Sequence, residues 1–202
     1  MRIKICGLTR MEDALLAARL GAWAVGFIFY EKSPRFIEPR EAGKIVAVLP
    51  PEMLSVGVFV NAPAERIAEA ARLSGIRAAQ FHGDETPEAL SNFRLETIKA
   101  FRPRRSTDLG SLAHYRPSLG FLIDSAVAGQ WGGSGVLSDW ALASEAKRYG
   151  PVILSGGLRP ENVREAIREV RPFAVDVASG VEREPGIKDH AKVERFFKEA
   201  RS

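Results

Sequence analysis

The feature that most constrains the fold is a repeated alternation of short apolar runs with amphipathic segments. Strand-like runs occur at residues 3–6, 24–29, 54–60, 78–81, 96–100, 120–124, 152–155 and 174–178. Helical patterns follow them at residues 11–20, 39–49, 62–73, 87–93, 107–114, 140–149, 161–170 and 191–201, the first expected to be capped by Thr9. An open doubly wound sheet of this length more often has about five or six strands, so eight favour a (β/α)₈ TIM barrel. No linker divides the chain, and we predict one domain over residues 1–202.

Two of these runs indicate which side chains face the barrel interior. In the first run Lys4 and Cys6 alternate with isoleucines, and in the last run Asp176 alternates with valines. The apolar face of a barrel strand packs against the helices, so Lys4, Cys6 and Asp176 are expected inside. The first and last strands become neighbours when the barrel closes, and an unpaired buried ammonium is costly. We therefore predict an ion pair between Lys4 and Asp176.

Composition narrows the class of partner and compartment. The net charge is +4, and basic residues are scattered among acids, without the basic stripe and interleaved aromatics of nucleic-acid binders. No apolar run approaches membrane-spanning length, and residues 1–5 are strand-like rather than an export signal. The single cysteine fits a reducing compartment. We expect a cytoplasmic protein without nucleic-acid or membrane partners.

Glycine-rich loops follow the seventh and eighth strand-like runs. The first contains Gly156 and Gly157, and the second contains Ser179 and Gly180. Glycine lets the backbone approach an anion closely, and these two loops of a (β/α)₈ barrel frequently form a phosphate site. The alternative is a pair of ordinary tight turns. Because both loops carry the pattern, we predict a phosphorylated small-molecule substrate.

Asp124 and Cys6 end the sixth and first runs, on either side of these loops. Each has an ordinary alternative, since aspartate often caps turns and a free cysteine is usually a small core residue. Around the ring the order is six, seven, eight, one, so a bound phosphate would place the adjoining carbons between a carboxylic acid and a thiol. An aldose–ketose isomerisation requires such an acid and base. The glycine-rich segment at residues 125–135 is expected to close over the ligand.

Further candidates follow other strands. Arg35 comes after the second run, and its planar guanidinium suits a second anionic group such as a carboxylate, although an exposed loop arginine is an equal alternative. Gln80 and His82 end the fourth run and are weaker candidates. The three histidines lack metal-like spacing, so we expect no metal.

Eight segments carry a resemblance to a known family. They are residues 4–9 (KICGLT), 26–36 (GFIFYEKSPRF), 57–61 (GVFVN), 80–85 (QFHGDE), 122–125 (LIDS), 132–135 (GGSG), 155–162 (SGGLRPEN) and 175–182 (VDVASGVE). In this order and combination the chain resembles phosphoribosylanthranilate isomerase, a (β/α)₈ enzyme of tryptophan biosynthesis. Departures from the family pattern include Phe81 for a more usual leucine, Ala178 for a frequent serine, and Val-Leu-Ser at residues 136–138.

The resemblance implies an Amadori rearrangement of N-(5′-phosphoribosyl)anthranilate without metal or organic cofactor. It implies that Asp124 protonates the ribose ring oxygen and that Cys6 takes the proton from C2. It further implies that Arg35 meets the anthranilate carboxylate and that the backbones of the two glycine loops hold the phosphate. A homodimer is also considered, because oligomerisation is one route to stability.

Three other functions are weighed. An indole-glycerol-phosphate synthase would need a lysine as acid and additional N-terminal sequence. A ribulose-phosphate epimerase would need paired aspartates and metal-binding histidines. A catalytically inactive scaffold barrel is disfavoured because Cys6 and Asp124 are both present.

Overall fold

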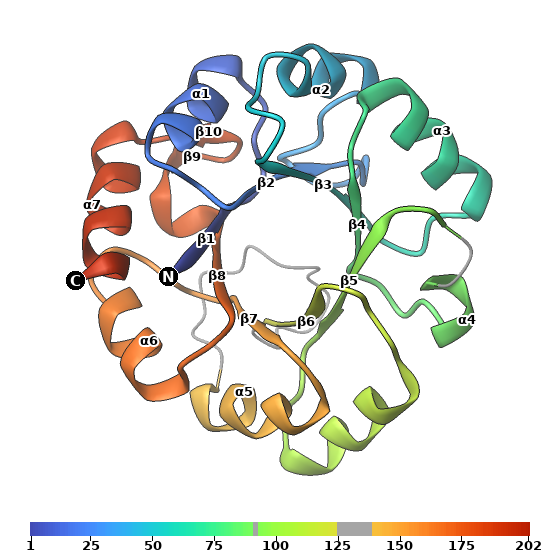
Figure 1. Ribbon diagram of the computed structural model, residues 1–202, viewed down its shortest axis with the longest axis vertical. Coiled ribbons are helices and arrows are strands. Elements are labelled where there is room, and N and C mark those ends of the chain that lie inside the picture. Colours follow the sequence, from blue (N-terminus) through green and yellow to red (C-terminus); the bar gives the residue numbers. More distant parts are fainter. Residues whose placement is uncertain (91–92, 125–138) are drawn as a thin grey trace.

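A closed barrel of eight parallel strands forms the centre of the molecule (Figure 1). The computed structural model describes residues 1–90, 93–124 and 139–202. The strands follow chain order around the ring, with β1 beside β8. Their bounds are β1 Arg2–Ile5, β2 Ala24–Ile28, β3 Leu54–Phe59, β4 Ala78–Phe81, β5 Glu96–Phe101, β6 Gly120–Ile123, β7 Val152–Leu154 and β8 Ala174–Val177. The predicted (β/α)₈ barrel is confirmed.

Helices surround the barrel and connect its strands (Figure 1). They are α1 Met11–Arg19, α2 Pro39–Val46, α3 Ala64–Ser74, α4 Pro87–Leu90, α5 Trp140–Ala146, α6 Val163–Val170 and α7 His190–Arg201. Short 3₁₀ helices are η1 Ser106–His114, η2 Lys147–Tyr149 and η3 Ser179–Val181. The pattern at residues 107–114 thus forms a 3₁₀ helix instead of an α-helix. Among the described residues, no helix is long and apolar enough to cross a membrane.

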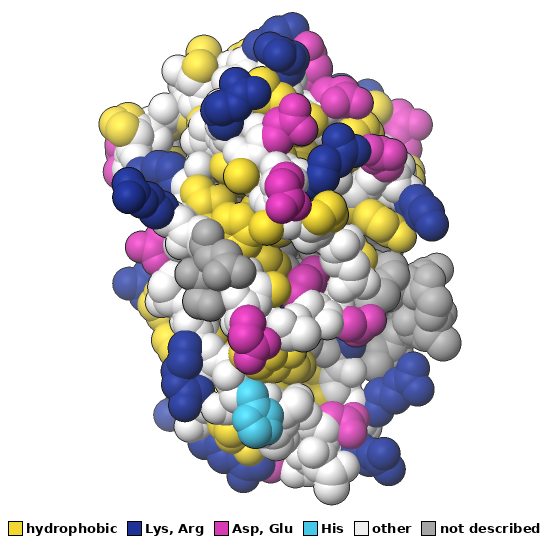
Figure 2. Space-filling model, turned by 90° about the vertical axis from the view of Figure 1, so that its right-hand side faces the viewer, with side chains coloured by type: hydrophobic (Ala, Val, Ile, Leu, Met, Phe, Trp, Pro, Cys, Tyr) yellow, Lys and Arg dark blue, Asp and Glu magenta, His cyan; other side chains and the backbone are white. Residues whose placement is uncertain are grey.

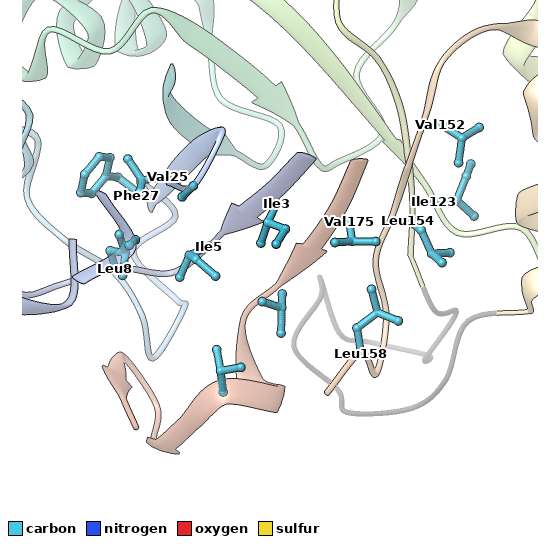
Figure 3. Close-up of a cluster of buried hydrophobic side chains, with 14 of the residues drawn as sticks. Ile3, Ile5, Leu8, Val25, Phe27, Ile123, Val152, Leu154, Leu158 and Val175 are labelled. Carbon is cyan, nitrogen blue, oxygen red and sulfur yellow. The ribbon is translucent and has the colours of Figure 1, made fainter. Parts of the chain in front are cut away.

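The apolar core lies mainly between the strands and the helices. Ile3 and Ile5 of β1 pack there with Val175 of β8 and the outward-facing residues of neighbouring strands (Figure 3). A second cluster fills the barrel interior towards the amino ends of the strands: Ala24, Val56, Ala78, Ile98, Ala100, Leu122, Ile153 and Ala174. Towards the carboxyl ends of the strands, the interior residues become polar, with Gln80, Asp124 and Asp176 all buried. The polar layer lies at the end of the barrel where (β/α)₈ enzymes hold their active sites.

The junction of β1 and β8 confirms the predicted interior ion pair. Lys4 is directly opposite Asp176 in the strand register. Its Nζ lies 2.8 Å from Asp176 Oδ1, and its side chain is 0% exposed. Burial acts to lower the pKa of Lys4, but the charge of Asp176 and the neighbouring Cys6 raise it above its usual value. The Lys4 ammonium is therefore retained inside the barrel.

A small antiparallel hairpin follows β8 and was not expected from the sequence. It consists of β9 Glu182–Glu184 and β10 Ile187–Lys188, and it lies outside the barrel beside α1 (Figure 1). Thr9 does not cap α1; its hydroxyl instead donates to the Gly186 carbonyl in the turn of this hairpin. The hairpin thus fastens the chain after β8 to the loop after β1.

The outer surface carries charges of both signs. On the face seen in Figure 2, lysine and arginine side chains are interspersed with aspartate and glutamate side chains. Exposed ion pairs include Lys44 with Glu41 and Arg66 with Glu31. Pairs of this kind contribute little to stability.

Candidate active site

Cys6 lies immediately after β1 and is buried in the barrel mouth, which is the end of the barrel formed by the carboxyl ends of the strands. Its backbone N–H donates to the Val177 carbonyl of β8 at 2.9 Å, which extends the ladder by one residue. Its sulfur packs over Gly26 of β2, where an added Cβ would stand 2.7 Å from Sγ. Two neighbouring strands therefore fix the position of the thiol.

The electrostatic surroundings of Cys6 favour the thiol over the thiolate. Burial raises the pKa of Cys6, and the nearby Asp176 carboxylate acts in the same direction. The ammonium groups of Lys4 and Lys188 oppose this rise without cancelling it. Lys4 therefore acts to lower the pKa of the thiol, but desolvation is the larger effect.

Lys188 of β10 holds the ends of β1 and β8 together. Its Nζ donates to the carbonyl of Cys6 at 2.7 Å, to the carbonyl of Ala178 at 3.1 Å and to Glu182 Oε1 at 2.9 Å. Its side chain is fully buried. Burial acts to raise the pKa of Glu182, but bonds from Arg35 and the charge of Lys188 lower it below its usual value. Glu182 is thus an anion between two cations.

Arg35 reaches the same cluster from the loop after β2. Its Nε donates to both Glu182 oxygens at 2.9 and 3.1 Å, and its Nη2 donates to Oε2 at 2.8 Å. The exposed-loop alternative is wrong, because the residue is buried. The aliphatic stem of Arg35 lies over the loop after β1, where its Cδ would be 2.7 Å from a Cβ added at Gly7. Nη1 takes no part in the Glu182 pair, so a further anion at Arg35 stays a prediction.

Asp124 follows β6 immediately and is buried next to the end of β4. The Nε2 atom of His82 lies 3.3 Å from Asp124 Oδ2, without hydrogen-bond alignment. Gln80 Nε2 lies 2.8 Å from His82 Nδ1. An amide nitrogen donates, so Nδ1 accepts, and a neutral imidazole in this arrangement carries its proton on Nε2, facing the carboxyl group. Burial lowers the pKa of Arg102, after β5, while the charge of nearby Asp124 acts to raise it.

The Asp124 side of the barrel mouth contains buried polar atoms that have no hydrogen-bond partner in the protein. Of the buried side-chain polar atoms in the described ranges, three have no hydrogen-bond partner, and two of them are Gln80 Oε1 and His82 Nε2. Buried polar atoms are nearly always bonded, and leaving one unbonded costs about 1–3 kcal/mol. Their presence at one end of a barrel indicates a place for polar groups of a ligand.

The two glycine loops after β7 and β8 are brought into direct contact. Gly156 and Gly157 adopt positive φ angles of 85° and 64°. A Cβ added to Gly180 would stand 1.9 Å from the Leu158 carbonyl oxygen, so a side chain there would collide with backbone. Asn162 holds the first loop by donating to the Gly157 carbonyl at 3.0 Å. The predicted neighbourhood of the two loops is confirmed, whereas phosphate binding stays a prediction.

The ring order puts these loops between Asp124 and Cys6. Going from β6 through β7 and β8 to β1, the strand ends present Asp124, the two loops and Cys6 in turn. The segment at residues 125–135, expected to close over a ligand, lies outside the described residues, as do residues 136–138. Within the described ranges, no group of three or more His, Cys, Asp or Glu side chains is placed to hold a metal ion.

Comparison with known proteins decides the family. The family model for N-(5′-phosphoribosyl)anthranilate (PRA) isomerase matches residues 3–199. A curated relative, N-(5′-phosphoribosyl)anthranilate isomerase of Geobacter metallireducens, is 46% identical over 202 residues, covering all of both chains. The chain belongs to the N-(5′-phosphoribosyl)anthranilate isomerase family. The resemblance carried by the eight sequence segments is thereby confirmed.

Solved structures of phosphoribosylanthranilate isomerases have the same fold. One holds reduced 1-(o-carboxyphenylamino)-1-deoxyribulose 5-phosphate; it has a TM-score of 0.89 and 43% identity, and the match covers 100% of this chain and 98% of that one. Another consists of monomers generated from the dimeric isomerase of Thermotoga maritima, with a TM-score of 0.89, 41% identity and the same coverage.

The Lys188–Glu182 cluster was not predicted from the sequence. Both residues lie in or beside the hairpin, and Lys188 reaches Cys6 across 182 residues of sequence. The Pro185-Gly186 dipeptide was the available signal, because it marks a turn between two short extended runs.

Proposed function

We propose that Asp124 and Cys6 are the general acid and the general base with which this barrel isomerises N-(5′-phosphoribosyl)anthranilate. The product is 1-(2-carboxyphenylamino)-1-deoxyribulose 5-phosphate, an intermediate in tryptophan biosynthesis. The observation that carries the assignment is the ring order, in which a carboxyl group and a thiol flank two glycine loops in contact with each other.

The first step is ring opening. Asp124 gives its proton to the ribose ring oxygen, the bond from that oxygen to C1 breaks, and the anthranilate nitrogen lone pair forms a C=N bond to C1. The carboxylate left on Asp124 faces His82 Nε2 at 3.3 Å. The imidazole, held through Nδ1 by Gln80, orients the acid.

The second step is proton abstraction. Cys6, as thiolate, takes the proton from C2, and the C2–H electrons form a C1=C2 bond while the C=N electrons return to nitrogen. The resulting enolamine tautomerises to the ketone. Because burial raises the pKa of Cys6, the thiolate is the minor form at neutral pH. We expect the rate of this step to rise with pH past the ordinary thiol pKa of about 8.5.

The substrate is bound by residues on opposite sides of the barrel mouth. The backbones of Gly156, Gly157, Ser179 and Gly180 hold the phosphate, and Arg35 Nη1 meets the anthranilate carboxylate. Gln80 Oε1, which has no protein partner, accepts a hydrogen bond from a hydroxyl group of the ribulose chain. Each of these contacts matches a donor or acceptor of the protein with a polar group of the substrate.

One assay tests the proposal. Purified protein should remove the fluorescence of chemically generated phosphoribosylanthranilate, and Asp124→Asn should lower kcat by about 10²–10⁴-fold, the usual contribution of general acid catalysis. An amide keeps the shape and cannot donate the ring-opening proton. Normal turnover by the folded variant would refute the acid assignment.

Two further properties belong to this proposal. The reaction takes place in the cytoplasm, which the single cysteine supports. The chain forms a homodimer, which the dimeric relative supports together with the exposed Met1 and Val48, 44% and 51% exposed. Met1 precedes β1 and Val48 precedes β3, so both lie at the end of the barrel opposite the mouth. A monomeric mass in sedimentation equilibrium would contradict the dimer.

A further inference from the structure

Lys188 contacts the backbone on both sides of the proposed site, next to the thiol of Cys6 and next to the second glycine loop. Its Nζ contacts only three oxygen atoms in the described hydrogen-bond network: the Cys6 carbonyl, the Ala178 carbonyl and Glu182 Oε1. The first carbonyl belongs to the residue with the reactive thiol. The second immediately precedes Ser179, which begins the second glycine loop. One ammonium group thus binds the backbone at both places.

The geometry of the peptide bond gives these contacts a consequence. In a trans peptide the C=O and the following N–H point in opposite directions. The structure has no cis peptide bonds among its described residues. A Lys188 that holds the Ala178 carbonyl therefore directs the Ser179 N–H to the opposite side of that peptide. Lys188 also holds the Cys6 carbonyl, so it directs the Gly7 N–H to the opposite side of the peptide that links Cys6 to Gly7.

The ammonium is itself held firmly in place. Glu182 Oε1 accepts a hydrogen bond from the ammonium, and Arg35 binds the same carboxylate through two nitrogens. The Lys188 backbone N–H donates to Asp13 Oδ2 at 3.1 Å, and Asp13 is bound in turn by Arg10 and His190. Because both ends of the residue are anchored, the carbonyls it binds have little freedom to rotate.

We propose that Lys188 is a positioning residue that couples the base to the phosphate loop, holding Cys6 and the Ser179 N–H in one fixed arrangement. Glu182 and Arg35 form the support that keeps its ammonium there. This inference rests on the proposed function, because it takes Cys6 as base and the Ser179 loop as phosphate site. It assigns to the β9–β10 hairpin a role in the site itself.

Lys188 also contributes charge to the surroundings of the thiol. The groups that face Cys6 are Lys4 of its own strand, Asp176 of β8 and Lys188 of β10. Burial and Asp176 raise the pKa of Cys6, and Lys4 and Lys188 act to lower it. Removing the Lys188 charge should therefore move the titration of the thiol to higher pH, which a purely structural lysine at a distance would not do.

The test is Lys188→Met, which keeps the length and apolar stem of the side chain. We expect kcat to fall about 10–100-fold, as for a displaced reacting group, together with a higher KM for the phosphorylated substrate. The pH midpoint of alkylation by iodoacetamide should shift upward, and Cys6 is the single cysteine, so the readout is unambiguous. The affinity for inorganic phosphate, measured by calorimetry, should fall several-fold.

Lys192→Met is the matched control. Lys192 Nζ donates to the Glu182 carbonyl at 2.9 Å, so it fastens the same hairpin without touching the Cys6 or Ala178 carbonyls. We expect its alkylation midpoint, kcat and phosphate affinity to equal those of the wild type. Equal shifts in both variants would overturn the coupling role and leave the hairpin as a structural element.

A second variant covers the case in which Lys188→Met does not fold. Lys188→Gln keeps a donor and removes the charge, and it should still raise the alkylation midpoint. A folded Met or Gln variant with the wild-type alkylation profile and wild-type kinetics would overturn the inference. The alkylation and phosphate measurements need no turnover. Wild-type protein without isomerase activity would therefore contradict the proposed function and leave the test of Lys188 intact.

Discussion

The two sides of the barrel mouth are built differently. Around Cys6, charged groups from three elements bind one another: Lys188 and Arg35 share Glu182, and Lys188 also binds backbone carbonyls. Around Asp124, the neighbouring Gln80 and His82 each keep a buried polar atom without a protein partner.

The two sides differ in whether their polar groups are bonded within the protein or left unbonded. The Cys6 side, which we propose as the base side, has its charged groups bonded to one another within the protein, so these residues determine where the thiol lies. The Asp124 side, which we propose as the acid side, retains unbonded polar atoms that a substrate rich in hydroxyl groups can satisfy. Changes on the base side should therefore affect stability and geometry together, whereas changes on the acid side should affect turnover with little effect on stability.

Apart from exchanges of Asp124 and Cys6 themselves, the largest effect that sharpens this comparison is expected for His82→Leu. Loss of the imidazole should lower kcat/KM about 10–100-fold, because the acid loses the group that orients it. The midpoint of thermal unfolding should change little, because removing the unbonded Nε2 offsets the loss of the bond between His82 Nδ1 and Gln80 Nε2. Wild-type turnover, or a large loss of stability with intact turnover, would contradict this division of roles.

On the base side, Glu182→Gln should lower the free energy of unfolding by about 1.5–3 kcal/mol at neutral pH, the range for hydrogen bonds to charged groups. The pKa of Glu182 is below its usual value, so the folded state favours the carboxylate. That stability is present above the ordinary carboxyl pKa of about 4.3 and is lost as pH falls through the depressed value. The variant should therefore lose less stability on acidification.

Chemical denaturation between pH 3 and pH 7 measures this effect. Glu184→Gln is the control, because Glu184 belongs to the same hairpin and its side chain is 63% exposed. We expect its stability curve to follow that of the wild type. If Glu182→Gln also followed the wild-type curve, the ion cluster would not stabilise the base side.

A smaller effect is expected from Gly26→Ala. The new methyl group would stand 2.7 Å from Cys6 Sγ and 3.3 Å from Cys6 Cα, so the thiol must move. We expect kcat to fall about tenfold while the barrel remains folded. Gly110→Ala is the control, because a Cβ at Gly110 meets nothing within 4 Å. Equal turnover in the two variants would show that the position of the thiol is not critical.

The sequence predicted what depends on local periodicity and ring closure. Alternation of Lys4 with isoleucines and of Asp176 with valines was sufficient to place their ion pair, because a closed barrel must bring its first and last strands together. The order of Asp124, the glycine loops and Cys6 follows from the same closure.

The remaining features depend on contacts without a local signature. Lys188 reaches Cys6 across 182 residues, and no pattern near Lys188 indicates that partner. Arg35 was expected to face a substrate anion, and its tight pair with Glu182 became visible only in three dimensions. Thr9 had the residue type of a helix cap, but its hydroxyl donates to Gly186. One domain over residues 1–202 and the roles of the site residues stay predictions.

The most direct test of the account is the turnover and stability of Cys6→Ala, measured on the same preparation. As the base, Cys6 is required for proton abstraction from C2, so kcat should fall at least about 10²–10⁴-fold. Loss of one buried sulfur from a small side chain should lower the free energy of unfolding by only about 1 kcal/mol. A folded variant with no turnover is the predicted result. A variant that turns over normally, or one that loses its fold, would contradict the assignment of Cys6 as base.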